Sequence, residues 1–237
     1  KAEAEEQYRL AVQSNPSYAD AYHNLSVLLY ELGRKDEAEE QLRHCLAIKS
    51  DQNHASTHNN LGLLLNELGR KGEAEEQYRL AIKSDPNQAS AHYNLGVLLN
   101  ELGRTDEAEE QYRLALKSNP SYAGAFNNLG LLLNELGRKD EAEEQFRQAI
   151  KSDPNHASAH NNLGLLLKEL GRKSEAEEQF RQAIKANPSL AAVHNNLGIL
   201  LDDLGRKAEA EEQYRLAIKS DPSLAAVHNN LGILLDD

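Results

Sequence analysis

The chain has 237 residues, 40% hydrophobic and 27% charged, and its 26 Lys and Arg against 38 Asp and Glu give a formal net charge of −12. This acidic balance argues against a nucleic-acid partner, and the one Cys excludes an intrachain disulfide framework. No apolar run approaches the roughly 18 residues that a membrane span needs, and no signal-type N-terminus is present, so we expect no membrane partner and a cytoplasmic protein. Because Met is absent even from the first position, we interpret the sequence as a segment of a longer one.

The elements follow from an internal repeat of about 34 residues. In chain order we predict a helix over 1–15, then helical hairpins that start near residues 19, 55, 89, 123, 157 and 191, and a last helix over 225–237. We expect a single domain over 1–237, because such an array grows without needing a new core. The turn glycines that set the period are Gly33, Gly69, Gly103, Gly137, Gly171 and Gly205.

One hairpin illustrates all of them. Its first helix is expected over 89–102, its turn at Gly103, and its second helix over 106–117, which Pro120 ends. Counting from Ala89 as position 1, seven positions share an apolar face at 100° per residue. Gly96 on that face is expected to let a neighbouring backbone approach closely. The residues of this predicted core face are Ala91, His92, Leu95, Gly96, Leu98, Leu99 and Leu102.

This period, with its glycines and with Ala108, Tyr112, Ala115 and Pro120 at their places, resembles the tetratricopeptide repeat family over essentially the whole chain. The resemblance implies an all-α fold, a right-handed superhelical solenoid whose first helices line the concave side. The chain departs from the family at the large aromatic early in the first helix. Histidines hold that place in five units: His58, His92, His160, His194 and His228.

One unit is irregular. Between Gln41 and Ala55 the chain has two extra residues and no Pro. Inside the second helix they would rotate everything after them by about 200° and destroy the apolar face. We therefore expect either a longer second helix or a bulged link over 48–54.

No catalytic constellation is apparent. Cys45 takes the place that Ala holds in the other units, so it is interpreted as a buried filler rather than a reactive thiol. The pairs His54/His58 and His156/His160 have the spacing of two metal ligands, but no third ligand converges on them. Glu109 and Glu110 recur identically, as a solvated face does, and are not an acid/base pair. We predict no enzyme, no cofactor and no metal site.

The informative stripe lies opposite the core on the first helix. It combines amides at positions 5, 6 and 12 with an aliphatic line at position 9. Position 6 holds Asn24, Asn60, Asn94, Asn128, Asn162, Asn196 and Asn230. Position 5 adds Asn59, Asn127, Asn161, Asn195 and Asn229, and position 12 adds Asn66, Asn100 and Asn134. Position 9 holds Val27, Leu63, Val97, Leu131, Leu165, Ile199 and Ile233.

These residue types suit recognition of an extended peptide or protein segment. An amide both donates and accepts, as a peptide backbone requires, and packed helices lie ~8–10 Å apart, about three residues of extended chain. Alternatively, the amides bond neighbouring helices to each other. Both interpretations stay open for position 6, and we favour binding for positions 5, 9 and 12. Such ladders resemble the repeat region of the O-linked N-acetylglucosamine transferases, in the solenoid only.

Three functions follow. The first is a non-catalytic interaction scaffold whose concave groove binds an extended peptide, with the acidic row from Glu31 to Glu169 favouring some basic residues. The second is the substrate-selecting arm of a glycosyltransferase whose catalytic domain is absent. The third is a self-associating, near-consensus array: the chain opens with a second helix and closes with a first, so chains could stack head to tail.

Overall fold

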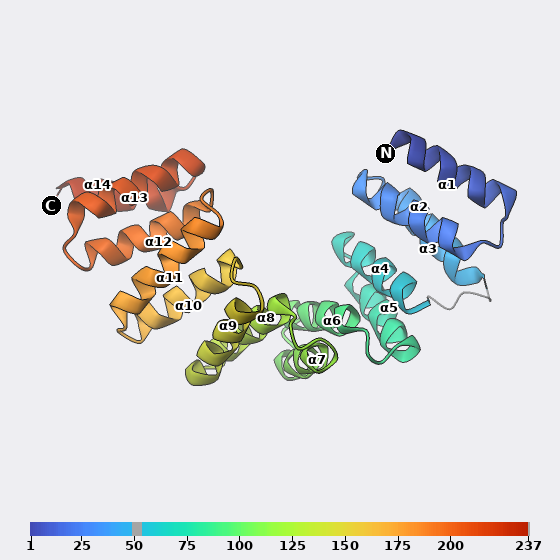
Figure 1. Cartoon of the computed structure of the whole chain (residues 1–237), viewed down its shortest axis with the longest axis horizontal. Coiled ribbons are helices and arrows are strands. Elements are labelled where there is room, and N and C mark those ends of the chain that lie inside the picture. Colours follow the sequence, from blue (N-terminus) through green and yellow to red (C-terminus); the bar gives the residue numbers. More distant parts are fainter. Residues whose placement is uncertain (49–53, 237) are drawn as a thin grey trace. The chain divides into compact units, whose positions relative to one another are not determined.

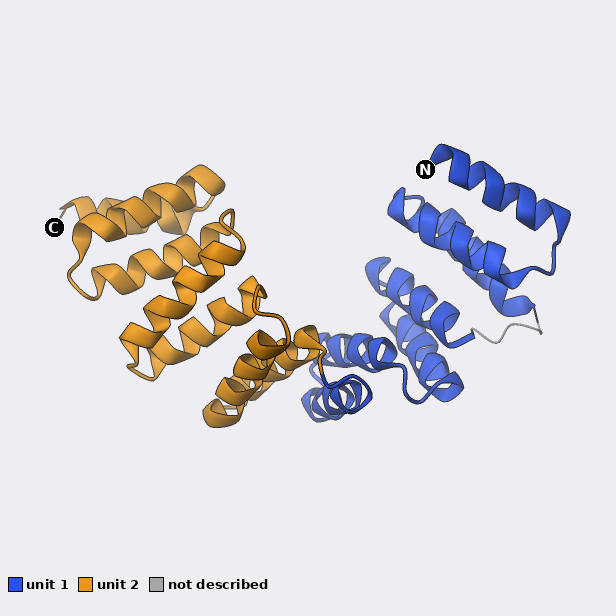
Figure 2. Cartoon of the chain, in the orientation of Figure 1, with its two compact units in different colours: residues 1–120 blue, residues 121–237 orange. Residues whose placement is uncertain are grey.

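A computed structural model describes residues 1–48 and 54–236. Its elements are fourteen helices, and the described residues contain no strand (Figure 1). The helices fall into two compact units, Lys1–Pro120 and Ser121–Asp237 (Figure 2). The fold class expected from the sequence, an all-α array of tandem helical hairpins, is confirmed. That 1–237 forms one domain stays a prediction.

Unit 1 consists of seven helices. Each hairpin packs against the next, because α1 contacts α2, α3 contacts α4 and α5 contacts α6. The hairpins themselves are α2–α3, α4–α5 and α6–α7. The bounds are α1 Ala2–Ser14, α2 Ala19–Glu31, α3 Lys35–Ala47, α4 His54–Glu67, α5 Lys71–Ser84, α6 Ala89–Glu101 and α7 Thr105–Ser118.

Unit 2 repeats this arrangement. Its hairpins are α8–α9, α10–α11 and α12–α13, and α14 packs against α13. The bounds are α8 Ala123–Glu135, α9 Lys139–Ser152, α10 Ala157–Glu169, α11 Lys173–Ala186, α12 Ala191–Asp202, α13 Lys207–Ser220 and α14 Ala225–Asp236.

The turn glycines end the first helices. Gly103 has φ 73°, a left-handed conformation that a side chain disfavours. The chain then reverses so that the backbone N–H of Arg104 donates to the carbonyl of Leu99 at 2.9 Å. Because α6 ends at Glu101, Leu102 lies outside the helix and is 42% exposed. Placing Leu102 on the core face was therefore wrong, whereas the other six predicted positions of that face are buried.

The core of each hairpin depends on a pair formed by a glycine and an aromatic ring. A Cβ added at Gly130 would lie 2.7 Å from the ring of Phe146, closer than any real contact. The same holds for Gly96 and Tyr112, at 2.8 Å. The close backbone that the sequence led us to expect is present at Gly96, where the carbonyl oxygen of Ala108 would lie 3.4 Å from the added Cβ. The ring of the second helix lies nearer and occupies most of the space that a side chain would take.

Of the two expectations for the irregular unit, the structure tests the longer second helix. Helix α3 ends at Ala47 with 13 residues, one fewer than α5, so a longer second helix is wrong. The bulged link that we also expected falls mainly on residues 49–53, which lie outside the described residues.

Candidate peptide-binding site

The first helices carry the predicted stripe, which we call the amide–aliphatic face: positions 5, 6, 9 and 12 of α2, α4 and α6 in unit 1 and of α8, α10, α12 and α14 in unit 2. Leu131 is 38% exposed and Leu165 42% exposed, although core leucines flank each of them in the sequence. Position 9 points away from the core because it stands about 100° or more from positions 7, 8, 10 and 11 on the helix. Val27 and Ile233 are also exposed, while Leu63, Val97 and Ile199 are half-buried.

In unit 2 the amides of positions 5 and 6 form a ladder of hydrogen bonds that runs from Asn196 to Asn128. Nδ2 of Asn196 donates to Oδ1 of Asn161 at 3.0 Å, and Nδ2 of Asn161 donates to Oδ1 of Asn162 at 3.2 Å. Asn162 in turn donates to Asn127 at 2.9 Å, and Asn127 to Asn128 at 3.2 Å. A separate bond of the same kind joins α14 to α12, where Asn230 donates to Asn195 at 3.0 Å. The ladder thus ties each first helix to its neighbour.

These bonds use half of what each inner amide offers. A side-chain amide has two N–H donors and two carbonyl lone pairs, and Asn161 and Asn162 each use one donor and one lone pair here. Both side chains remain partly exposed. Asn127, by contrast, is only 6% exposed. The amides of the ladder therefore bond neighbouring helices to each other. A ligand would contact only the second donor or acceptor of the exposed asparagines.

Unit 1 has a shorter version of the ladder. Asn94 donates to Asn59 at 3.0 Å, and Asn59 is buried. His23 and Tyr93 stand at the other two position-5 places. Asn24 is exposed, and Asn60 lies beside a pocket described below.

Two of the position-12 amides hold an acceptor without a partner in the part of the chain that the structure describes. Oδ1 of Asn66 in unit 1 and Oδ1 of Asn134 in unit 2 are buried and accept no hydrogen bond from the described residues. A buried acceptor without a donor costs free energy, so a donor that reached either oxygen would be favoured. Asn100 is half-buried at the equivalent place on α6.

The acidic row beside this face is largely neutralised. Glu67 forms an ion pair with Lys35 and Glu101 with Lys71, both at 2.8 Å, and each lysine comes from the preceding hairpin. Glu31 pairs with Lys1 at 2.9 Å. The preference for basic ligands that the sequence suggested is therefore weaker than the count of glutamates implies.

Of the five repeated histidines, three pack inside the hairpins, while His58 is half-buried and His228 on α14 is exposed. His92 is 4% exposed; its Nε2 donates to the carbonyl of Pro86 at 3.0 Å, and its Nδ1 lies 2.8 Å from the side-chain amide of Gln111. His160 and His194 repeat both contacts. The ring replaces the family's aromatic while bonding the second helix and the link. The packing of these histidines at the aromatic position was expected from the sequence, whereas their two hydrogen bonds were not, although Gln and Pro recur at fixed distances from each His.

The residues weighed for metal or thiol chemistry have structural contacts. Nδ1 of His156 accepts from the backbone N–H of Ala159 and caps α10. The rings of His54 and His58 have centroids 6.2 Å apart. Among residues 1–48 and 54–236, no group of three or more metal-ligating side chains occurs. Cys45 is buried, with its Sγ 3.5 Å from Oγ1 of Thr57.

The comparisons with known proteins agree on one family. Family models described as tetratricopeptide repeat match residues 43–89, 59–123, 101–157, 127–191 and 161–225, and a second such model matches 19–49. No curated protein matches the chain. None of the described helices has the length and hydropathy that a membrane crossing requires.

Solved structures with this fold are numerous. PilF of Pseudomonas aeruginosa is 26% identical, with a TM-score of 0.71 over 78% of this chain and 85% of its own. YrrB, described as a TPR protein with an unusual peptide-binding site, is 23% identical, with a TM-score of 0.60 over 77% of this chain and 94% of its own. The Cut9–Hcn1 structure from the APC/C is 15% identical, with a TM-score of 0.81 over 98% of this chain and 46% of its own.

Proposed function

This chain belongs to the tetratricopeptide repeat family, and from that premise we propose that it is a non-catalytic scaffold whose amide–aliphatic face binds an extended peptide or protein segment. The observation that carries the proposal is the row of exposed aliphatic side chains beside amides with unused donors and acceptors. Exposed apolar side chains that recur on one face are typical of an interaction surface. That YrrB is described by its peptide-binding site supports the same class of ligand.

The aliphatic side chains and the amides of this face would have different roles in binding. The aliphatic side chains, such as Leu131 and Leu165, would supply most of the free energy of binding, because they lose exposed apolar area to the ligand. The second N–H or lone pair of Asn161 and Asn162 would pair the ligand backbone and set its register.

A selection of displayed random linear peptides tests this proposal. The matched variants are Leu165→Lys on the face and Leu170→Lys, which is 39% exposed but follows α10 at its turn. We expect Leu165→Lys to weaken selected peptides by roughly 10-fold or more, because a charge replaces buried apolar contact. Leu170→Lys should leave the affinity unchanged. Equal affinities for both variants would overturn the proposal.

Two finer possibilities stay predictions. Self-association through the terminal helices is favoured by the exposure of Ile233 and Leu235 on α14, and a mass that rises with concentration would support it. The role of a substrate-selecting arm rests on the amide ladder, and a glycosyltransferase activity that depends on these amides would support it. A cytoplasmic location likewise stays a prediction.

A further inference from the structure

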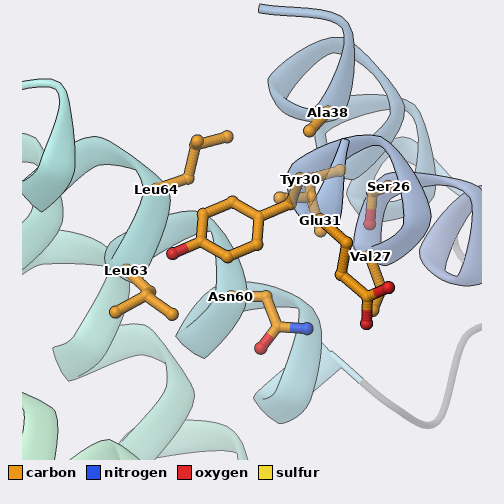
Figure 3. A pocket seen from close by; sticks show the side chains of 9 residues that line it. Ser26, Val27, Tyr30, Glu31, Ala38, Asn60, Leu63 and Leu64 are labelled. Carbon is orange, nitrogen blue, oxygen red and sulfur yellow. The ribbon is translucent and has the colours of Figure 1, made fainter. Parts of the chain in front are cut away.

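Unit 1 contains a pocket between α2, α3 and α4 (Figure 3). Its volume is about 280 Å³. Val27 and Leu63 of the amide–aliphatic face line it together with Asn60, so the pocket adjoins that face. Ser26 and Leu42 line it on the side of the core. Most of its wall is therefore hydrocarbon, with a few polar groups.

The pocket exists because this hairpin lacks a ring. The five other complete hairpins pair a glycine of the first helix with a Tyr or Phe of the second, as Gly62 pairs with Tyr78. In α2–α3 both partners differ: Ser26 stands in the place of the glycine and Leu42 in the place of the ring. The two departures belong together, because a Cβ at the glycine place would lie 2.6 Å from the ring, as it would at Gly62.

Its polar groups are fixed by neighbouring bonds. Oγ of Ser26 donates to the carbonyl of His23 at 2.6 Å. The hydroxyl of Tyr30 donates to Glu67, which also pairs with Lys35. Burial and then the neighbouring Glu67 raise the pKa of Tyr30 to about 12. In Figure 3 the Tyr30 ring stands among Leu63, Leu64 and Asn60.

We propose that this pocket binds the aromatic ring of a Phe or Tyr side chain, carried by the extended peptide on the amide–aliphatic face. That a peptide brings the ring to the pocket rests on the proposed function. That the occupant is an aromatic ring rests on the ring that this hairpin lacks. An apolar cavity of ~150 Å³ is enough for benzene, so 280 Å³ accommodates a phenol. A buried aromatic anchor of this kind dominates the free energy of many interfaces.

Small ring compounds test the pocket without any peptide. The probes are toluene and p-cresol, the side-chain analogues of Phe and Tyr, followed by methyl NMR of the whole chain. We expect saturable shifts at the methyl groups of Val27, Leu42 and Leu63, which line the pocket. Shifts that do not saturate, or that spread evenly over the leucines of both units, would overturn the proposal.

Two double variants are matched controls. S26G/L42Y restores the pair of the other hairpins and should abolish the probe-induced shifts. G62S/Y78L transplants the pocket pair into α4–α5 and should create a second set of shifts at Val97 and Leu98. Circular dichroism verifies the helix content of each. If S26G/L42Y fails to fold, the titration of the wild type and that of G62S/Y78L still test the proposal. Unchanged binding in a folded S26G/L42Y contradicts it.

A peptide experiment separates this proposal from the proposed function. Peptides selected on the wild type should carry Phe or Tyr at one position and bind S26G/L42Y roughly 10- to 100-fold weaker. Replacing that peptide residue by Ala should cost the same factor on the wild type and little on S26G/L42Y. Peptides that bind both proteins equally overturn the pocket's role and leave the proposed function standing. If no peptide binds, the proposed function fails, whereas p-cresol binding that depends on Leu42 still supports a ring site.

Discussion

Nδ2 of Asn162 on α10 donates to Oδ1 of Asn127 on α8, at 2.9 Å. This bond joins two first helices whose contact residues are 35 positions apart in the chain. It recurs between Asn196 and Asn161, so it belongs to the repeat rather than to one hairpin. Position-6 amides that make this bond, such as Asn162 and Asn196, therefore stabilise the stack, and their remaining donors and acceptors are what a ligand could use.

Asn162→Ala should lower the free energy of unfolding by about 1–3 kcal/mol, because it removes a hydrogen bond and leaves the acceptor of the buried Asn127 unpaired. The matched control is Asn24→Ala, which is exposed and makes no hydrogen bond among the described residues. Its cost should stay below about 0.5 kcal/mol. Both variants gain the same helix propensity, so urea unfolding isolates the bond. Equal stabilities would mean that the ladder contributes nothing.

Gly130→Ala should destabilise the chain by about 1–3 kcal/mol, because the new methyl group would collide with the ring of Phe146 at 2.7 Å. Gly232→Ala makes the same chemical change at the same repeat position, but nothing lies within 4 Å of its Cβ. Alanine should therefore gain up to about 1 kcal/mol there through helix propensity. Thermal unfolding of the two variants checks this opposite sign. A loss of stability in Gly232→Ala would contradict the assignment of the cost to the ring.

A closed ring of ion pairs predicts a pH dependence. Arg147 and Arg172 each lie 2.7 Å from Glu143, and they contact Glu175 at 3.4 and 2.7 Å. Burial pushes the pKa of Glu143 upward, but hydrogen bonds from Arg147 and Arg172 outweigh it, so the pKa lies below its ordinary value of 4.5. Arg172 in the same way lowers the pKa of Glu175.

A lowered folded-state pKa means that the unfolded chain takes up protons first as the pH falls. The contribution of Glu143 is therefore complete above about pH 5 and is lost as the pH drops below 4.5 towards its folded-state pKa. Glu143→Gln should flatten the fall of the urea midpoint between about pH 5 and 3. Glu178→Gln, which removes a carboxylate without an ion pair among the described residues, should leave the profile as it is. If Glu143→Gln leaves the pH dependence of the urea midpoint unaltered, the ion pairs of Glu143 do not cause it.

Cys45 should be inert towards thiol reagents in the native chain. Its side chain is 0% exposed between α3 and α4, so modification requires local or global opening. We expect a rate at least about 100-fold below that in denaturant. The control is the same reagent in urea above the unfolding transition. Equal rates in both conditions would show that α3 and α4 do not pack as described.

The features that could be predicted from the sequence are those that depend on residues close together in the chain. A turn glycine such as Gly103 acts on its own neighbours, so the helix bounds were expected to within about one residue. Six of the seven positions expected on the core face of α6 are buried. Leu102 was misplaced because the helix ends just before it. The ring of Tyr112 against Gly96 was missed because spacing alone does not show which atoms fill the gap.

The site was less predictable because its bonds cross hairpins. Whether Asn162 meets a neighbouring helix or the solvent depends on how α8 and α10 pack, so the sequence left both interpretations open. Glu143 and its equivalents were expected on a solvated face, yet arginines from two hairpins surround Glu143 and leave it 17% exposed. The sequence marks the pocket, since Ser26 and Leu42 depart from the repeat in one hairpin. Only the contact of Gly62 with the Tyr78 ring in the structure shows that these departures remove a ring from the hairpin.

The central claim, that the amide–aliphatic face binds an extended peptide, is tested most directly by mapping a selected peptide onto the chain with methyl NMR. The account predicts that a peptide on unit 1 gives its largest shifts at Val27, Leu63 and Val97. A peptide on unit 2 gives them at Leu131, Leu165 and Ile199, and in either case Leu114 and Ile150 on second helices stay unchanged. Shifts concentrated on Leu114 and Ile150, with Leu131 and Leu165 unmoved, would contradict it.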